Sequence, residues 1–584
     1  MITRYLACAS ALFAIVTLGA ACKSDGGGID AEFITIAQTS PMEGADDVVV
    51  GTRVGFQVSD GAQIDPATLN AQTFFLTDED GNAIPGTYAV GGDDNDPTVA
   101  VMVLDEPLDV ITKYTATVTT GLVASGVSLE ENFEWDFTTI DSEWGESEWL
   151  ESIGTGVSDG PQVAVNPQLD AFAVWEYEEP EGTSVWANRY TRTEVWGTPM
   201  PLEPGVFGSS NPAVAADGEG NAFAVWERRR AEGVPRDNIW SSRYDPAAGW
   251  SEPELLQTGT TVPDGRIPSI AADTSGNAIA VWLERNPNTS EEVATANIYT
   301  VGAGWGSPER IDAPSEMLVG LNAGNNLAVE VDATGNAIAL WSRPGVEGDV
   351  LWSNRYTAGM GWGAAEEVKS DPATDATSNQ LSVGANGDAL AVWIQNEGAR
   401  NDIWGARYSS GSWAAPERID THDGNDKSAP DVAVNGLGVA HVVWSQVEPY
   451  PDPELLDDDI ANIYAREYSP ETGWAAPELI EPPRTDADGN LDPNEDGDAT
   501  SPRVSTNADG NTFVVWRQIW QDWGSIWSNR RDPGNEWNGA ELIEDLPRAA
   551  RSAQIAVDDD RHAHAVWLHN LDNGASWVRT NRFE

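Results

Sequence analysis

A motif ending in tryptophan recurs along most of this 584-residue chain and constrains its fold more than any other feature. Clear copies read P-x-V-A-x-D-x-x-G-N-A-x-A-V-W, for example at 212–226. The final residue, called the head tryptophan below, recurs at a mean spacing of 56 residues at Trp175, Trp226, Trp282, Trp341, Trp393, Trp444, Trp516 and Trp567. A fixed period of this length predicts repeated units that bury their apolar faces against one another.

Each repeat contains four candidate β-strands. Strand A is the first half of the head motif, and strand B runs into the head tryptophan. Strand C carries I-W-x-x-R-Y, as at 238–244, and strand D carries a P-E-L/I tail, as at 249–256. The D-x-x-G-N turn between A and B suits a tight hairpin. Four-stranded units repeated radially form a β-propeller.

The two ends of the repeat region complement each other. The last head is followed by a C strand at 576–583 and no tail, whereas an orphan tail at 144–153 precedes the first head. We therefore expect a propeller over 141–584, with blades from 161 to 584 and the orphan strand closing the last blade. Eight heads and eight tails predict eight blades; the alternative is seven, with one divergent repeat extruded. A linear stack is disfavoured because a split blade has no purpose in one.

The repeated aromatic and basic residues are expected to pack the blades together. The head and strand-C tryptophans should fill the space between neighbouring blades. The strand-C arginines should pair with tail glutamates such as Glu254, Glu417 and Glu478, or with strand carbonyls. These arginines are Arg189, Arg243, Arg355, Arg407, Arg466, Arg530 and Arg582.

A separate domain is expected over 33–140. Short alternating strands, for example at 54–58 and 114–120, are punctuated by Asp-Gly and Gly-Asn turns, which predicts a β-sandwich. The pieces at 40–50, 64–86, 106–122 and 133–139 resemble the bacterial Ig-like domain of S-layer and other surface proteins. The resemblance implies a spacer or adhesion module, with Trp135 and Phe137 in packing roles. The fold class is therefore all-β, an Ig-like β-sandwich followed by a β-propeller.

The N-terminal 22 residues have the pattern of a secretory signal: Arg4, then an apolar run from Leu6 to Leu18, then small residues. The end of this segment resembles a bacterial lipoprotein signal, which implies lipidation of Cys22 after cleavage. Residues 23–32 begin with a glycine-rich run and are expected to be a flexible tether. Lys23 after the cysteine implies outer-membrane rather than inner-membrane retention. We expect an envelope lipoprotein, attached to the membrane by this anchor and either periplasmic or surface-exposed.

The net charge of −62, from 32 basic and 94 acidic residues, opposes binding to nucleic acid. The chain has two cysteines, too few for a disulfide scaffold or a cysteine-based zinc site.

The B–C and D–A loops vary most among the repeats, so we expect a protein or glycan partner on the face that they share. One D–A loop alternates oxygen-bearing side chains in a pattern suited to Ca²⁺, which takes six to eight oxygen ligands. These residues are Asp486, Asp488, Asn490, Asp492, Asn494, Asp496 and Asp498. The loop resembles calcium loops of EF-hand and thrombospondin-type repeats but departs from EF-hand spacing, and a solvated acidic loop is the alternative.

Trp520 and Trp523, in the B–C loop of the seventh repeat, are extra to the repeat pattern. Exposed tryptophans can stack on sugar rings or anchor a protein, so both are candidate binding residues. The alternative is that they cap the mouth of the propeller channel.

No catalytic motif is recognisable in the sequence. The sialidase Asp-box, G-x-S-x-G, H-E-x-x-H and phosphate loops are not matched. His562 and His564 are expected in core or surface roles rather than at a metal. Two hypotheses remain: a non-enzymatic envelope lipoprotein whose Ig-like stalk presents a propeller binding head, or a sialidase-like glycan hydrolase or lyase. A cluster of non-repeat carboxylate, tyrosine and arginine in the channel would favour the enzyme.

Overall fold

The computed structural model places the chain in two compact units, one ending at Glu143 and the other beginning at Trp144. Regular structure in the described residues is β-sheet apart from one 3-10 helix, η1 (Pro66–Thr68). The residues described are 33–48, 53–59, 61–79, 81–91, 96–104, 108, 112–139, 143–151, 156–167, 170–191, 195–203, 205, 208–229, 237–257, 264–285, 292–312, 327–344, 348–369, 375–396, 400–421, 426–448, 460–481, 498–520, 523–544, 546, 549–571 and 574–583.

The first unit is a sandwich of two main sheets, with strand orders β1-β3-β7-β6 and β2-β11-β8-β4-β5, and a small β10-β9 hairpin. Its strands are β1 (Ile36–Ser40), β2 (Ala45–Val48), β3 (Val54–Val58), β4 (Phe74–Thr77), β5 (Ala83–Ile84), β6 (Gly86–Gly91), β7 (Asp96–Leu104), β8 (Lys113–Val118), β9 (Val123–Ala124), β10 (Val127–Ser128) and β11 (Phe133–Thr139).

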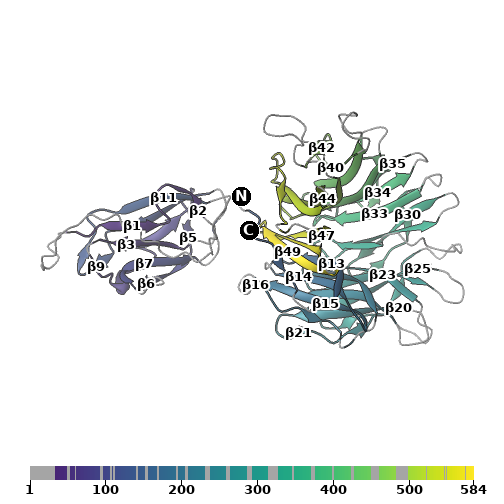
Figure 1. Cartoon of the computed structure of the whole chain (residues 1–584), viewed down its shortest axis with the longest axis horizontal. Helices are drawn as coiled ribbons and strands as arrows, with labels where there is room; N and C mark the ends of the chain where they lie inside the picture. Colours follow the sequence, from purple (N-terminus) through teal and green to yellow (C-terminus); the bar gives the residue numbers. More distant parts are fainter. Residues whose placement is uncertain are drawn as a thin grey trace. The chain divides into compact units, whose positions relative to one another are not determined.

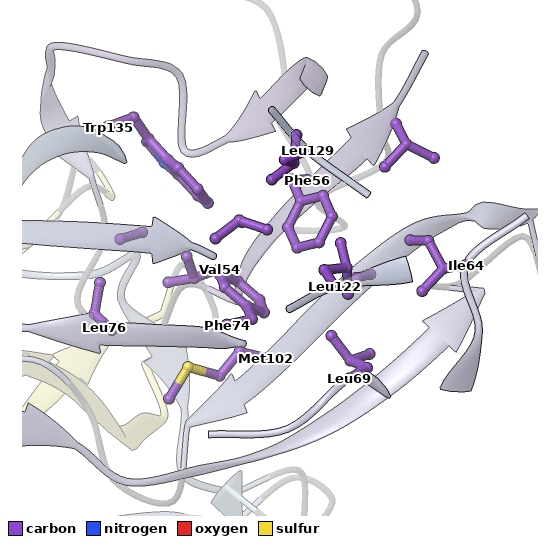
Figure 2. Close-up of a cluster of buried hydrophobic side chains, with 14 of the residues drawn as sticks. Val54, Phe56, Ile64, Leu69, Phe74, Leu76, Met102, Leu122, Leu129 and Trp135 are labelled. Atoms are coloured by element: carbon purple, nitrogen blue, oxygen red, sulfur yellow. The ribbon is translucent and has the colours of Figure 1, made fainter. Parts of the chain in front are cut away.

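The core of the sandwich follows from the two-residue period of its strands. Alternate residues of β4 and β11 turn inward, so that Phe74 packs against both Phe56 and Trp135 (Figure 2). Trp135 and Phe137 are buried, which confirms their expected packing role.

The second unit consists of eight antiparallel sheets arranged around a centre (Figure 1). The sheets are called blades 1 to 8 in chain order. The innermost strands are β13 (Val157–Val165), β18 (Ser209–Ala216), β23 (Asp264–Ala272), β28 (Ala328–Val331), β33 (Asp375–Val383), β38 (Lys427–Val434), β43 (Ala499–Thr506) and β47 (Ala550–Val557). Each adjoins the next, and β47 adjoins β13, so the ring is closed. The predicted eight-bladed propeller is confirmed.

The second and third strands of each blade are long and pair in unbroken register. The second strands are β14 (Ala171–Glu179), β19 (Ala222–Arg229), β24 (Ala278–Arg285), β29 (Ala337–Pro344), β34 (Ala389–Asn396), β39 (Ala440–Glu448), β44 (Thr512–Trp520) and β48 (Ala563–Asn570). The third strands are β15 (Gly182–Thr191), β20 (Asp237–Asp245), β25 (Glu292–Thr300), β30 (Asp349–Thr357), β35 (Asn401–Ser409), β40 (Ile460–Ser469), β45 (Trp523–Arg531) and β49 (Ser576–Phe583).

The fourth strand differs from the expected continuous D strand. In blades 1 to 6 it is two short segments that both pair with the third strand. A proline such as Pro253 stands between the segments in most blades and cannot donate to the ladder, which accounts for the break there. The outer segments are β16 (Val195–Trp196), β17 (Met200–Pro201), β21 (Gly249–Trp250), β22 (Glu254–Leu255), β26 (Gly304–Trp305), β27 (Glu309–Arg310), β31 (Gly361–Trp362), β32 (Glu366–Glu367), β36 (Ser412–Trp413), β37 (Glu417–Arg418), β41 (Gly473–Trp474), β42 (Glu478–Leu479) and β46 (Glu541–Leu542).

The orphan tail closes the ring as the sequence predicts. Strand β12 (Glu148–Trp149) pairs with β49 at the edge of blade 8. The buried Glu151 carboxylate that follows accepts hydrogen bonds from the Val578 amide at 2.6 Å and the Trp175 indole at 3.0 Å. Because Val578 belongs to blade 8 and Trp175 to blade 1, this one side chain joins the two ends of the propeller.

The head tryptophans lie between blades, as expected. Trp226 of blade 2 packs on Val185 and Leu202 of blade 1, and Trp175 of blade 1 packs on Leu568 and Val578 of blade 8. All eight head tryptophans are buried. Each removes a large apolar surface from water, which makes them main contributors to cohesion between blades.

Most of the repeated arginines are arranged differently from the prediction. Arg407 does pair with its tail glutamate, Glu417, at 3.4 Å. Most of the others stack on an aromatic ring of the next blade, as Arg189 does 5.0 Å from the ring centre of Tyr244. The guanidinium is planar and delocalised, so it stacks on a ring while bonding in its own plane.

The predicted alignment of Arg466 with the repeated arginines is wrong by one position. It occupies the asparagine position of the repeat and, like Asn354 in blade 4, donates to a carbonyl of the preceding blade; here that carbonyl belongs to Ile419. The residue that replaces the repeated arginine in blade 6 is Glu467.

Candidate functional site: the central channel

The eight innermost strands line a cavity of about 580 Å³ along the centre of the propeller. This volume lies within the range of ligand-binding pockets. Its described lining contains no aromatic ring and is rich in amide, hydroxyl and charged side chains. The cavity, called the central channel below, is therefore suited to a polar ligand.

Two rings of side chains face the channel. First-ring residues pair in register with the residue that precedes the head tryptophan of the same blade. Second-ring residues lie two positions later in the same innermost strand. The first ring is Gln162, Ala213, Ser269, Ala328, Gln380, Asp431, Arg503 and Gln554. At the second-ring position most blades have alanine or serine, but blade 4 has Glu330.

A bulge at the start of each fully described innermost strand aims these side chains. The bulge residue has positive φ, for example +51° at Asn211 and +52° at Ile267. In both cases a glutamate of the preceding blade accepts the bulge amide at 2.7 Å: Glu176 accepts that of Asn211, and Glu227 that of Ile267. These bonds hold a backbone conformation that a β-branched residue otherwise avoids.

Two carboxyl groups line the channel, Glu330 from blade 4 and Asp431 from blade 6, and the charge of the second acts on the first. The surrounding protein displaces water from Glu330, and with the negative charge of Asp431 raises the Glu330 pKa to about 7. Burial also raises the pKa of Asp431, although Arg503 and the Val504 amide oppose that shift. That amide donates to the Asp431 carboxylate at 2.9 Å. The Glu330 side chain is exposed to the channel, so it can exchange a proton near neutral pH.

Arg503 and three glutamines supply further polar groups. The Arg503 guanidinium donates to the Pro502 carbonyl at 3.0 Å and lies next to Asp431 in the first ring. The side-chain amides of Gln162, Gln380 and Gln554 have no hydrogen-bond partner within the described part of the chain and face the channel. Unpaired donors and acceptors around one cavity can form hydrogen bonds with a ligand rich in hydroxyl groups.

Of the predicted calcium ligands, Asp498 is the one among the described residues. Asp486 to Asp496 lie outside the described residues. Asp498 is described, and its carboxylate accepts the Ala461 amide at 3.0 Å. Asp264, Asp375 and Asp426 accept equivalent amides at other junctions, so Asp498 has a structural role common to the repeats. No metal-binding group of three or more His, Cys, Asp or Glu occurs among the residues that are described.

Trp520 and Trp523 end a hairpin rather than belonging to a long loop. They are paired in the backbone register of β44 and β45, with residues 521–522 between them in sequence. Their side chains lie outside the description, so their binding role stays a prediction.

The other sequence candidates are placed as follows. Cys22 lies outside the described residues, and no described helix has the length and hydropathy needed to cross a membrane. His564 is buried and packs against Tyr190 and Trp196 of blade 1. His562 lies 3.2 Å from Asp558 in the adjacent turn.

Glu330, Asp431 and Arg503 are not among the site residues predicted from the sequence. The signal was present, because aligning the eight A strands on their turn residues shows charged side chains where most repeats have Ala, Ser or Gln. Only the radial arrangement shows that these positions face one cavity.

Residues 30–139 match the family model of the bacterial Ig-like domain. This match agrees with the expected domain type and covers the first unit alone. A comparison with curated proteins found no match to this chain.

Solved structures similar to this chain include several β-propellers. The polysaccharide lyase Uly1 is 10% identical, with 62% of this chain and 87% of that chain covered and a TM-score of 0.40. A GH93 α-L-arabinofuranosidase of Fusarium graminearum is 12% identical, with 56% and 95% covered and a TM-score of 0.34. The β-propeller domain of the Trilobed protease from Pyrococcus furiosus is 8% identical, with 67% and 96% covered and a TM-score of 0.37.

Proposed function

We propose that the propeller is a non-enzymatic binding head for a glycan, with the central channel as its binding site. The supporting observation is the set of unpaired amides with Arg503, Asp431 and Glu330 around one cavity of about 580 Å³. Sugars present many hydroxyl groups, each of which is a hydrogen-bond donor and acceptor. The amides, the guanidinium and the carboxyl groups of the channel wall can bond to both.

Calorimetric titration of the chain with oligosaccharides from bacterial envelopes tests this proposal. Saturable binding that weakens about tenfold in Gln380→Ala or Arg503→Ala is expected, since each loses about 1.4 kcal/mol of hydrogen bonding. Arg551→Ala is the control because this exposed side chain lies outside the channel wall. Binding that is unaffected by both channel variants would contradict the assignment of the site.

A second candidate is glycan hydrolysis. It is favoured by the Glu330 pKa of about 7, which the negative charge of Asp431 helps to raise. A carboxyl with such a pKa can donate a proton to a glycosidic oxygen while a second carboxylate acts as base or nucleophile. The Asp431–Arg503 neighbours supply the predicted carboxylate and arginine, but no tyrosine lines the described channel. New reducing ends released by the chain and abolished by Glu330→Gln would favour the enzyme; intact ligand after long incubation would favour binding alone.

The chain is also proposed to be an envelope lipoprotein, on the strength of its signal-like N-terminus and Cys22. Metabolic labelling with a fatty-acid analogue should mark the protein, and Cys22→Ala should abolish the label and release the chain from membranes. Calcium binding at 486–498 remains a prediction as well. Its test is Ca²⁺ calorimetry, with heat expected from the chain and lost in Asp488→Ala/Asp492→Ala.

A further inference from the structure

Most junctions between blades contain a repeated cation–aromatic contact. The strand-C arginine of one blade stacks on the aromatic ring at the next residue position in the following blade, with the guanidinium carbon 4.4 to 5.7 Å from the ring centre. The pairs are Arg189–Tyr244, Arg243–Tyr299, Arg355–Tyr408, Arg407–Tyr468, Arg530–Phe583 and Arg582–Tyr190. The set of contacts is called the arginine ladder below. The blade 6–7 junction keeps a cation in another form, an ion pair between Glu467 and Arg531.

The blade 3–4 junction departs from this pattern. Ile298 stands at the arginine position, and Tyr356 follows in the next blade at the aromatic position. A separate cavity of about 260 Å³ lies there, with Ile298 and Tyr356 both in its wall. This cavity is called the open slot.

The open slot arises from three smaller side chains. In blade 2, Phe223 pairs with Arg243, and the guanidinium lies between that ring and Tyr299. In blade 3, Ile279 and Ile298 occupy the two equivalent positions. Thr300 likewise replaces Asp245, which pairs with Arg243. The open slot therefore occupies the place that a guanidinium fills at neighbouring junctions.

The polar groups that remain in the open slot suit a cation. Asp273, in the A–B turn, accepts the backbone amides of Ser275 and Asn277 and the side-chain amide of Asn277, all at 2.9 Å, but no basic side chain pairs with it among the described residues. The equivalent Asp332 of blade 4 has Arg355 at 4.0 Å. The Tyr356 hydroxyl has no hydrogen bond within the same described set, whereas Tyr244 and Tyr408 accept one from an arginine.

We propose that the open slot binds the guanidinium group of an alkylguanidinium ligand, between the ring of Tyr356 and the carboxylate of Asp273. The walls of Ile279 and Ile298 take the alkyl stem. A guanidinium is preferred over an ammonium because it stacks on the ring face and bonds a carboxylate in its plane at the same time. The volume admits one such group and its stem rather than a larger ligand.

The probe is agmatine, titrated into the chain and followed by calorimetry and by the shift in melting temperature. Binding in the region of about 1 mM is expected for so small a ligand. 1-Aminobutane, which carries an ammonium on a similar stem, should bind at least about fivefold more weakly. A peptide Gly-Arg-Gly that binds more tightly than agmatine would indicate a protein source of the guanidinium; the reverse order would indicate a free metabolite.

Two variants locate the ligand. Ile298→Arg restores the arginine ladder, so it should raise the melting temperature and weaken agmatine binding more than about tenfold. Asp273→Asn removes the carboxylate and should weaken binding about tenfold. It should still fold, because Asn435 and Asn507 accept the same turn amides in blades 6 and 7.

The matched control is Val301→Arg, which adds the same charge at an exposed position beside the open slot without filling it. It should keep the agmatine affinity within about threefold. The proposal is overturned if agmatine gives no saturable binding, or if Ile298→Arg folds and binds agmatine as tightly as the original chain. If Ile298→Arg does not fold, unchanged binding in Asp273→Asn overturns the proposal by itself.

Discussion

Glu467 of blade 6 and Arg531 of blade 7 form an ion pair, with 3.2 Å between Oε2 and Nη2. They occupy the two positions that hold an arginine and an aromatic ring at most other junctions. Both residues depart from the repeat, and each departure compensates for the other. The junction still has one cation, but the later blade supplies it instead of the earlier one. His441 also contacts Glu467, at 3.3 Å, and its hydrogen bond lowers the Glu467 pKa.

Restoring the repeat pattern at this junction should reveal the coupling. Glu467→Arg alone places two guanidinium groups together and should cost about 2 kcal/mol of stability. Adding Arg531→Tyr supplies an aromatic ring for the new cation and should recover at least about 1 kcal/mol of that loss. Denaturant unfolding of the two single variants and the double variant measures the coupling. The exposed Arg551–Asp159 pair is the control cycle, and strictly additive effects at Glu467 and Arg531 would contradict the compensation.

Lys427 should be unusually sensitive to substitution. Its ammonium is fully buried, 3.1 Å from Asp402 and 3.2 Å from Asp420. Lys427→Met leaves two buried carboxylates with less positive charge near them, which should cost about 3 kcal/mol. Thermal unfolding followed by tryptophan fluorescence measures the loss. Arg551→Ala, at an exposed ion pair, should change stability by less than about 0.5 kcal/mol, and an equal effect of the two substitutions would refute this prediction.

His564 should make the propeller less stable in mild acid. Burial lowers its pKa from 6.5 to about 4, so the folded chain keeps the imidazole neutral while the unfolded chain binds a proton. Stability should therefore fall as the pH drops from about 6.5 to 4, by about 2 kcal/mol at pH 5. Phe172, Phe223 and Phe513 occupy the equivalent position, so His564→Phe should fold and lose this part of the pH dependence. Identical stability profiles of the two chains between pH 7.5 and pH 5 would contradict the assignment.

Glu330 should act in the opposite direction. Its folded pKa of about 7 lies above the usual 4.5, so the folded chain binds the proton more tightly than the unfolded chain. Its contribution is complete below about pH 4.5 and is lost as the pH rises through 7. Glu330→Gln should be more stable than the original chain at pH 8, by about 1 kcal/mol after screening by channel water, and equal to it at pH 4. Denaturant titrations at both pH values measure the difference, and a larger gain at pH 4 would exclude this explanation.

The repeat explains why the architecture was predictable. The head tryptophans, the four strand motifs and the orphan tail each recur in sequence order, and strand order within a blade follows sequence order. The break in the fourth strand and most of the arginine partners were not predicted from the sequence. The break in the fourth strand depends on where a proline interrupts the hydrogen-bond ladder. The partner of each arginine belongs to a neighbouring blade, about 55 residues away in sequence, as Tyr244 is from Arg189.

The sequence alone determined the all-β class, the Ig-like domain and the eight-bladed propeller. Alternating burial and turn residues are local properties of the chain, and in the propeller they recur in every repeat. Tertiary structure decided the sites. Glu330 and Asp431 line one channel only because the innermost strands form a closed ring. The open slot between Ile298 and Tyr356 exists only because three smaller side chains meet at one junction. Both candidate sites arise where residues depart from the repeat. What such a residue does depends on the side chains of other blades that pack around it, and the sequence order does not give those neighbours.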